Sequence, residues 1–363
     1  MDNWFLFMQL SVHLWVTGEE SLSFSSFLVI REMASKLHSR WYDTCLVKTY
    51  KAFVAHSKFF KPTKMKHLKF LQDTIIELYS IDIQKSYQQV LASLQQLAKS
   101  LQLAIRTMMK EDLKRVRNWQ YINCISLWVK FICCNFKEHD IESLLSLCIL
   151  VLKGMAYLFP GPRYVPLRFR CMQMLNQLSL SSGVFIPVAS LFFDCLEYKG
   201  KEIVTDSTHG WAIAVSNLAN NTCTSLTYLA LIFVRLVPKN LVKSQSFQKE
   251  CVLSAIELLS AHFLQWSHHI SFPELATFPL ILLRRFHDKL TDNTLHRQVK
   301  RFVDQILDRC WRISACNIVE QNREFIEKKR DGVSFSPNDQ VAIDSFIQKY
   351  LNGRICASDD KAQ

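Results

Sequence analysis

Four histidines that lie within one stretch of the chain raise the question of a metal site: His262, His268, His269 and His287. Zinc sites need His, Cys or carboxylate ligands at short spacings, such as H-E-x-x-H or C-x-x-C. The histidines do not follow such a spacing, and the 12 cysteines are scattered without any C-x-x-C pair. We therefore expect core or interface histidines, reduced and buried thiols, and neither a metal nor another cofactor.

Nucleophilic and phosphate-transfer chemistry also lack their usual motifs. Ser181-Ser182-Gly183 is not the G-x-S-x-G turn that exposes a catalytic serine. The sequence contains no G-x-x-x-x-G-K-[ST] loop to hold nucleotide phosphates. Without paired acid and base candidates, the sequence does not indicate an enzyme or a small-molecule substrate.

A corner rich in proline and arginine, PRYVPLRF at residues 162–169, is the best candidate for contact with a partner. Its prolines fix φ and stop the preceding helix, which would present Tyr164 and the basic residues Arg163, Arg168 and Arg170. Arginine binds phosphate or carboxylate with two hydrogen bonds, and an aromatic ring stacks on a base. The alternative is that Tyr164 packs between helices with the neighbouring Leu and Phe residues, while the arginines cap helix ends or are solvated.

Two further basic groups are candidates for contact with RNA. The first contains Lys58, Lys61, Lys64 and Lys66, bordered by phenylalanines, and the second is the triplet Lys328, Lys329 and Arg330. Lysines that neutralise phosphates would make affinity fall steeply with salt. The triplet is also a weak candidate for nuclear localisation. A solvated face without any ligand is the alternative in both cases.

The composition of the whole chain indicates helices. The 363 residues include only 8 Gly and 9 Pro, too few for a turn-rich β-sandwich or barrel, and 49% are hydrophobic. The formal charge of +12, with a pI near 9.1, favours an anionic partner such as RNA or an acidic protein segment. The apolar stretches are too short, or carry a charge, to predict a membrane span, and the N-terminus does not have the pattern of an export signal.

Apolar residues recur with a helical period along most of the chain. The pattern over residues 87–108 covers three heptads and stops at a charged turn, Lys110–Arg117. Breaks are expected near Pro62, residues 159–162, Gly183–Pro187, Gly200 and Pro273. Successive helix pairs without strand signals predict an all-α fold, a HEAT- or armadillo-like α-solenoid of antiparallel helix pairs.

Four sequence blocks, in the same order, resemble the nucleolar complex protein 2 family. They are residues 41–59 with YKAFVAHSKF; residues 118–121, NWQY, with Leu127-Trp128; PRYVPLRF with GVFIP at 183–187; and SHHISFPEL at 267–275, with FIEKKR at 325–330 and FSP at 335–337. Each block alone is modest, and the four in order are strong. The resemblance covers most of residues 41–350.

The resemblance implies a non-enzymatic, all-helical scaffold for biogenesis of the large (60S) ribosomal subunit. Such proteins are found in the nucleus, in nucleoli and nucleoplasm, where they bind sister nucleolar complex proteins and pre-60S particles. They act in pre-ribosome maturation and intranuclear transport, and contact with pre-rRNA is a further expectation. The alternative is an α-solenoid adaptor in transport or chromatin that does not contact RNA, and salt-sensitive RNA binding would separate the two.

The resemblance also suggests how the chain is divided. We expect an N-terminal helical segment at residues 1–40, the helical-repeat domain at 41–350 and a flexible tail at 351–363. The chain begins inside the helical part of the family, without the usual charged N-terminal region. Residues 207–233 and 306–318 do not match the family pattern, and we interpret them as inserts that form loose loops.

Overall fold

The computed structural model describes residues 2–36, 39–58, 64–136, 141–196, 237, 242, 245–267, 269, 271–290 and 293–314. The regular elements in these ranges are helices. The described residues form two compact units, one within Met1–Ser181 and Gly200–Gln248 and the other within Ser182–Lys199 and Lys249–Gln363. The all-α expectation is therefore confirmed.

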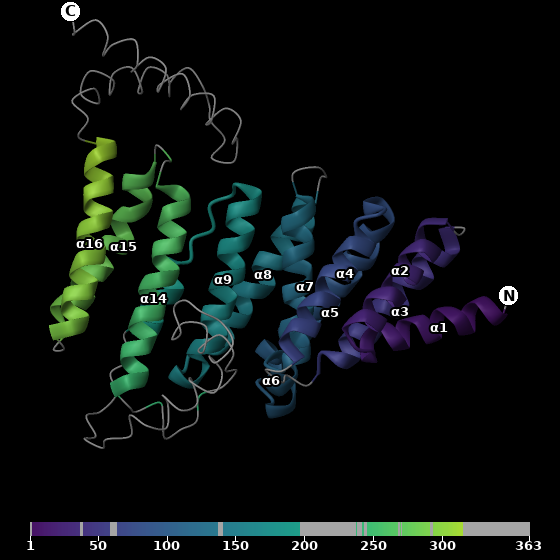
Figure 1. Cartoon of the computed structure of the whole chain (residues 1–363). Helices are drawn as coiled ribbons and strands as arrows, with labels where there is room; N and C mark the ends of the chain where they lie inside the picture. Colours follow the sequence, from purple (N-terminus) through teal and green to yellow (C-terminus); the bar gives the residue numbers. More distant parts are fainter. Residues whose placement is uncertain are drawn as a thin grey trace, which may run out of the picture. The chain divides into compact units, whose positions relative to one another are not determined.

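The first unit is an array of helices that follow one another along the chain (Figure 1). They are α1 (Asp2–Thr17), α2 (Glu20–Lys36), α3 (Ser39–His56), α4 (Met65–Tyr79), α5 (Ile83–Thr107), α6 (Lys110–Val116), α7 (Trp119–Asn135), α8 (Glu142–Leu158), the 3₁₀ turn η2 (Pro162–Tyr164) and α9 (Val165–Ser182). Helix α1 packs on α2 and α3, α2 packs on α3 and α4, and α3 packs on α4, α5 and α7. Packing on helices that follow nearby along the chain is the arrangement of an α-solenoid, and the HEAT or armadillo type stays a prediction.

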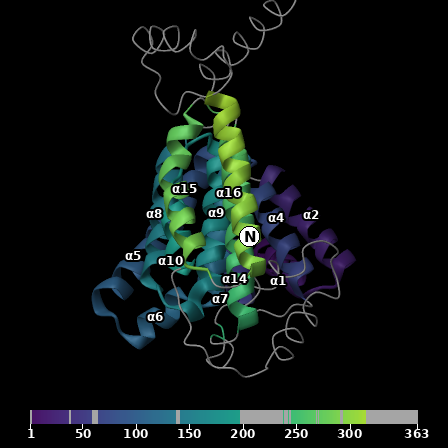
Figure 2. The same ribbon diagram turned by 90° about the vertical axis from the view of Figure 1, so that its left-hand side faces the viewer.

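Helix α5 shows how local sequence determines an element. The carboxylate of Asp82 accepts a hydrogen bond from the backbone N–H of Lys85 at 3.1 Å, which caps the first turn. The helix ends at Met108, which has a left-handed backbone with φ of 51°. Val90 and Leu94 lie on the buried stripe that the period predicts. The charged turn that follows forms the short helix α6, and α5 packs against both α6 and α8 (Figure 2).

The core of the first unit contains an aromatic cluster around Trp128, which is 1% exposed. The ring of Trp128 lies 5.1 Å from that of Tyr50, 5.4 Å from that of Tyr79 and 6.2 Å from that of Phe131. These residues come from α3, α4 and α7, so the cluster fixes three helices against one another.

The second unit contains α10 (Ala189–Leu196), most of α14 (Gln245–Trp266), α15 (Phe272–Asp288) and α16 (Asn293–Ser314). Helix α15 packs against α10 and α16. The predicted breaks at residues 159–162, Gly183–Pro187 and Pro273 are confirmed, because α8, α9 and α15 end or begin there. None of the helices in the described ranges is long and apolar enough to cross a membrane.

One expectation about the inserts is wrong. Residues 306–314 were expected in a loose loop, but they continue α16 to Ser314, and Ile306 is 3% exposed on its buried face. The apolar stripe of Val299, Phe302 and Val303 extends to Ile306, so the helix continues into the segment. Residues 207–233, 315–318 and the tail 351–363 lie outside the described part. The domain boundaries, and the interpretation of both segments as inserts, stay predictions.

Candidate functional site

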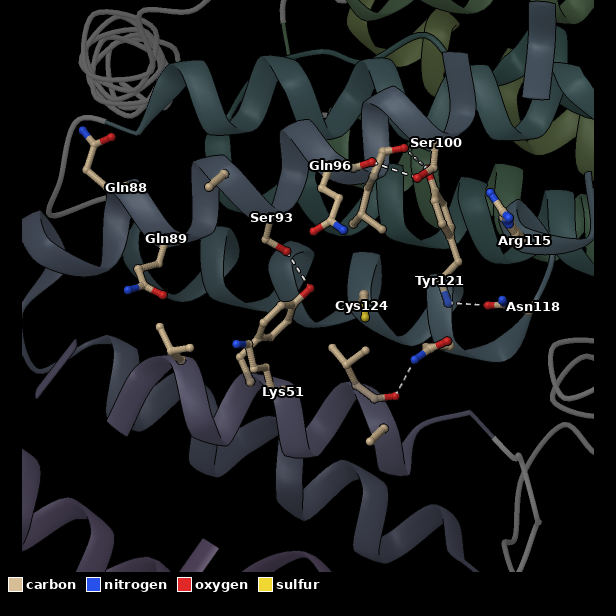
Figure 3. Close-up of a pocket in the computed structure, with 17 residues that line it drawn as sticks. Lys51, Gln88, Gln89, Ser93, Gln96, Ser100, Arg115, Asn118, Tyr121 and Cys124 are labelled. Carbon is tan, nitrogen blue, oxygen red and sulfur yellow. Dashed lines mark hydrogen bonds between the residues drawn. The ribbon is translucent and has the colours of Figure 1, made fainter. Parts of the chain in front are cut away.

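A groove of about 870 Å³ lies between α3 and α5, with the N-terminal end of α7 at its base (Figure 3). Helix α7 packs against both α3 and α5. The residues that line the groove are Val47, Tyr50, Lys51, Val54, Ala55, Gln88, Gln89, Ala92, Ser93, Gln96, Leu97, Ser100, Arg115, Asn118, Gln120, Tyr121 and Cys124. Its size is that of a binding site for a ligand or a peptide segment.

Hydrogen bonds across the base of the groove hold its walls in place. The hydroxyls of Tyr50 and Ser93 are 2.6 Å apart and join α3 to α5. The side-chain amide of Gln120 on α7 donates to the carbonyl of Val54 on α3 at 3.0 Å. The hydroxyl of Tyr121 donates to the carbonyl of Leu97 on α5, also at 3.0 Å. The groove is therefore a built feature of the array.

Amide side chains extend from α5 into the opening. Gln88 and Gln96 are exposed and Gln89 is half-buried, and all three lie on the wall formed by α5 (Figure 3). Their side chains do not form hydrogen bonds within the described residues. A primary amide offers both donors and an acceptor, so this wall presents a row of polar groups to a ligand.

The charges in the lining are positive. Lys51 on α3 is exposed, and Arg115 on α6 forms an exposed ion pair with Asp112 at 3.6 Å. The lining does not include a carboxylate. Burial raises the pKa of Tyr50 above its usual range and that of Cys124 to about 12, so both stay protonated at neutral pH. This lining is suited to binding an anionic or polar ligand.

The Pro–Arg corner is largely used inside the protein. Arg163 and Val237 form two hydrogen bonds: the side-chain Nε of Arg163 donates to the Val237 carbonyl, and the Val237 N–H donates to the Arg163 carbonyl, each at 3.0 Å. The hydroxyl of Tyr164 accepts a hydrogen bond from Arg117 at 2.7 Å, and its ring lies 4.9 Å from that of Phe159. Both residues are half-buried.

The other two arginines of the corner lie on α9. Arg168 is 1% exposed and donates to the carbonyl of Pro160 at 3.5 Å, so its side chain is not presented to a partner. The guanidinium of Arg170 lies 5.2 Å from the ring of Trp119, and burial lowers its pKa to about 10, so it stays charged. Leu167 and Phe169 are buried, at 2% and 0% exposure, as the alternative interpretation predicted.

The first lysine group is at the surface. Lys58, Lys64 and Lys66 are exposed, and the last two lie at the start of α4. The first turn of α4 does not contain an acidic residue. Lys61 and the triplet Lys328, Lys329 and Arg330 lie outside the described residues. Contact with RNA stays a prediction for both groups.

The described histidines differ in their surroundings. His262 is 1% exposed, and burial lowers its pKa to about 4, so it is neutral at physiological pH. The ring of His287 lies against that of His296 in a tilted arrangement, with ring centroids 3.6 Å apart. His268 lies outside the described residues. Among the residues that the structure describes, there is no group of three or more His, Cys, Asp or Glu side chains that would hold a metal ion.

The thiols of the described part are unreactive where they are buried. Burial raises the pKa of Cys45 to about 11 and that of Cys171 to about 12. Eight cysteines whose side chains the structure describes are free, and Cys45, Cys124, Cys148, Cys171 and Cys251 are buried. The prediction of reduced, buried thiols holds for those five.

The residues that line the groove were not among the predicted site residues. Its signal is present in the sequence: Gln88-Gln89 and Gln95-Gln96 repeat at seven residues, and so belong to one side of a helix. The repeat alone does not show that the neighbouring helix leaves a groove along this side.

The model of the Noc2p family matches residues 40–355. The chain belongs to the Noc2p family. This agrees with the resemblance in the four sequence blocks.

The sequences of curated relatives align with nearly the whole of this chain. Protein REBELOTE of Arabidopsis thaliana is 42% identical over 341 residues, which are 94% of this chain and 52% of the relative. Nucleolar complex-associated protein 2 of the same plant is 33% identical, covering 94% of this chain and 41% of the relative. Nucleolar complex protein 2 of Drosophila melanogaster is 24% identical, covering 93% and 41%. The chain thus spans about half, or less, of the length of these relatives.

Proposed function

We propose that this chain is a non-enzymatic helical scaffold for biogenesis of the large (60S) ribosomal subunit. The observation that carries the proposal is the Noc2p family match over residues 40–355. Two relatives are named as nucleolar complex proteins, which supports a place in the nucleolus and in ribosome assembly. The scaffold binds sister nucleolar complex proteins and pre-60S particles, and it travels with them between nucleolus and nucleoplasm.

The mechanism is positional. An array of helices offers a long surface for its length, and the groove between α3 and α5 adds a concave site within that surface. The described lining provides amides and cations but no ionised nucleophile or base at neutral pH. Binding energy at such surfaces holds an immature particle in one conformation until partners exchange.

A direct contact with pre-rRNA would involve the exposed lysines at the start of α4. Cations at a helix N-terminus oppose the helix dipole, and a bound phosphate would offset that cost. Replacing Lys64 and Lys66 with Glu is expected to weaken RNA binding and to reduce the slope of log affinity against log salt by about two. The matched control replaces two exposed lysines elsewhere, Lys99 and Lys110, with Glu.

The test of the proposed function is purification of the tagged protein from nuclear extract, with and without RNase, followed by mass spectrometry. The expected result is recovery of sister nucleolar complex proteins and pre-60S factors that survives RNase. Loss of these proteins with RNase would make RNA the link between them. Recovery of transport or chromatin proteins alone, without salt-sensitive RNA binding, would refute the proposal in favour of an adaptor.

A further inference from the structure

The groove between α3 and α5 has a length and spacing that select one kind of ligand. Its wall on α5 runs from Gln88 to Ser100, which at 1.5 Å per residue is about 18 Å. An extended chain rises about 3.3 Å per residue, so five or six residues of a strand would occupy it. The backbone groups of a bound α-helix are already paired within the helix, so they would leave the amides of the α5 wall without backbone partners, whereas an extended segment offers free backbone groups along its length.

The spacing of the amides matches an extended backbone. Gln89 and Gln96 are two helical turns apart, which is about 10.5 Å. Three residues of an extended peptide span about 10 Å, so the two amides meet peptide groups three residues apart. In an extended chain, peptide groups three residues apart present a carbonyl to the wall at one end and an N–H at the other, and a primary amide, which has both donors and an acceptor, pairs with either.

The charge of the lining determines the sign of the ligand. Lys51 does not form an ion pair within the described residues, and the other charged residue of the lining, Arg115, is a cation that pairs with Asp112 at 3.6 Å. A carboxylate is absent from the lining. The charge complement is a peptide that carries Asp or Glu.

The aromatic rings of the lining favour a peptide over single-stranded RNA. A groove for single-stranded RNA stacks bases on free aromatic faces and follows the backbone with a row of cations. The ring of Tyr50 is already packed against Trp128, at 5.1 Å, and Tyr121 is 6% exposed. The rings therefore support the walls of the groove and do not form a stacking platform.

We propose that the groove between α3 and α5 binds an extended, acidic segment of a partner protein. The side chains of Gln89 and Gln96 pair with its backbone, and Lys51 pairs with its carboxylates. The inference rests on the proposed scaffold function, for which it names the partner chemistry at one site.

The test is fluorescence polarisation of the purified protein with labelled peptides of about eight residues, long enough to cross the groove. The probes are a set of peptides that alternate Asp with varied neutral residues, a Lys-for-Asp set, and an oligouridylate of equal charge. Acidic peptides are expected to bind, and N-methylation of alternate residues is expected to abolish binding by removing the backbone donors. The basic set is expected to remain unbound.

Substitutions inside and outside the groove test whether the groove itself binds the peptide. Gln89→Leu with Gln96→Leu is expected to weaken peptide binding at least about tenfold, since two backbone contacts are lost. The matched control, Gln95→Leu with Gln102→Leu, has the same spacing on exposed positions of α5 outside the groove, and should bind as the natural protein does. Lys51→Glu should weaken binding, and Lys99→Glu should not.

Three results would overturn the inference: no acidic peptide binds, the two glutamine pairs behave alike, or the groove variants lose oligouridylate binding and keep peptide binding. The proposed function has its own readout. If Gln89→Leu with Gln96→Leu leaves the RNase-resistant recovery of nucleolar complex proteins intact while no acidic peptide binds, the scaffold function stands and the groove assignment fails.

Discussion

The hydroxyl of Ser93 joins the groove to the aromatic core, and its removal is a sharp test of the packing. Its Oγ, on α5, accepts a hydrogen bond from Nε1 of Trp128 on α7 at 2.8 Å and lies 2.6 Å from the hydroxyl of Tyr50 on α3. Ser93 is 7% exposed and Trp128 is 1% exposed. One hydroxyl thus links three helices at the base of the groove.

The substitution Ser93→Ala would leave the indole N–H of Trp128 buried without an acceptor. An unsatisfied buried donor costs about 1–3 kcal/mol, and the better helix propensity of Ala returns about 0.5 kcal/mol. The hydroxyl of Tyr50 is half-buried beside the open groove, where water replaces the lost partner. The expected net loss of stability is about 1.5 kcal/mol.

The assay is native-state hydrogen exchange, read on peptides from α5 and α7, because the two compact units need not unfold together. A loss of about 1.4 kcal/mol corresponds to tenfold faster exchange where opening is in equilibrium. Ser100→Ala is the matched control: Ser100 lies two turns along the same wall, but its hydroxyl bonds only to the carbonyl of Gln96 in its own helix, at 3.0 Å. Its exchange should change little.

A double-mutant cycle shows whether the cost comes from the indole. Trp128→Phe removes the N–H, so Ser93→Ala in that background should cost less than it does alone, by about 1 kcal/mol. Equal exchange in Ser93→Ala and Ser100→Ala, or equal costs in both backgrounds, would refute the reasoning. It would mean that the Trp128–Ser93 hydrogen bond does not contribute to the array.

Two further predictions concern stability. The pKa of His262 is about 4 in the folded protein and near 6.5 when unfolded, so only the unfolded chain binds a proton between these values. Stability is intact above pH 6.5 and falls below it towards pH 4, by about 3 kcal/mol at most, and the pH slope of urea unfolding should flatten in His262→Phe. At Gly154 on α8, an added Cβ would lie 2.9 Å from Cδ2 of Leu101 on α5. Gly154→Ala should be near neutral because Ala gains about 1 kcal/mol of helix preference, whereas Gly154→Val should lower the melting temperature through overpacking of about 1–3 kcal/mol, and equal melting temperatures would contradict the close packing.

The helices were predictable because their signals are local. The apolar period over residues 87–108 gives α5, and the breaks near Pro162, Gly183 and Pro273 give the ends of their neighbours. Where the prediction was wrong, at residues 306–314, it rested on the mismatch with the family pattern. The apolar stripe that begins at Val299 reaches the first residue of the segment, Ile306, and α16 continues to Ser314.

The burial of the Pro–Arg corner was not predictable from the motif alone. An arginine is expected at the protein surface, because charged side chains are rarely fully buried. The neighbours of Arg168 on α9 are buried on both sides: Leu167 is 2% exposed and Phe169 is 0% exposed. Helix α9 is buried on most of its circumference, with Asn176 and Ser179 among its buried residues, so it is an interior helix and Arg168 lies inside with it.

The groove depends on the separation of helices, which periodicity does not report. The glutamine repeat of α5 is equally consistent with a solvated face. The opening exists because α7 lies beneath both walls and because the hydroxyl pair of Tyr50 and Ser93 closes only its base. This is a property of three helices that are far apart in sequence.

The corner and the groove are nevertheless connected through the start of α7. Arg117 donates to the hydroxyl of Tyr164, and Trp119 lies under the guanidinium of Arg170 at 5.2 Å. Between Arg117 and Trp119 stands Asn118, which lines the groove and caps α7 by accepting from the N–H of Tyr121 at 2.7 Å. The residues that sequence reasoning chose for contact thus hold both neighbours of a groove residue. In the structure these contacts fix the start of α7, and a shift there would move the base of the groove.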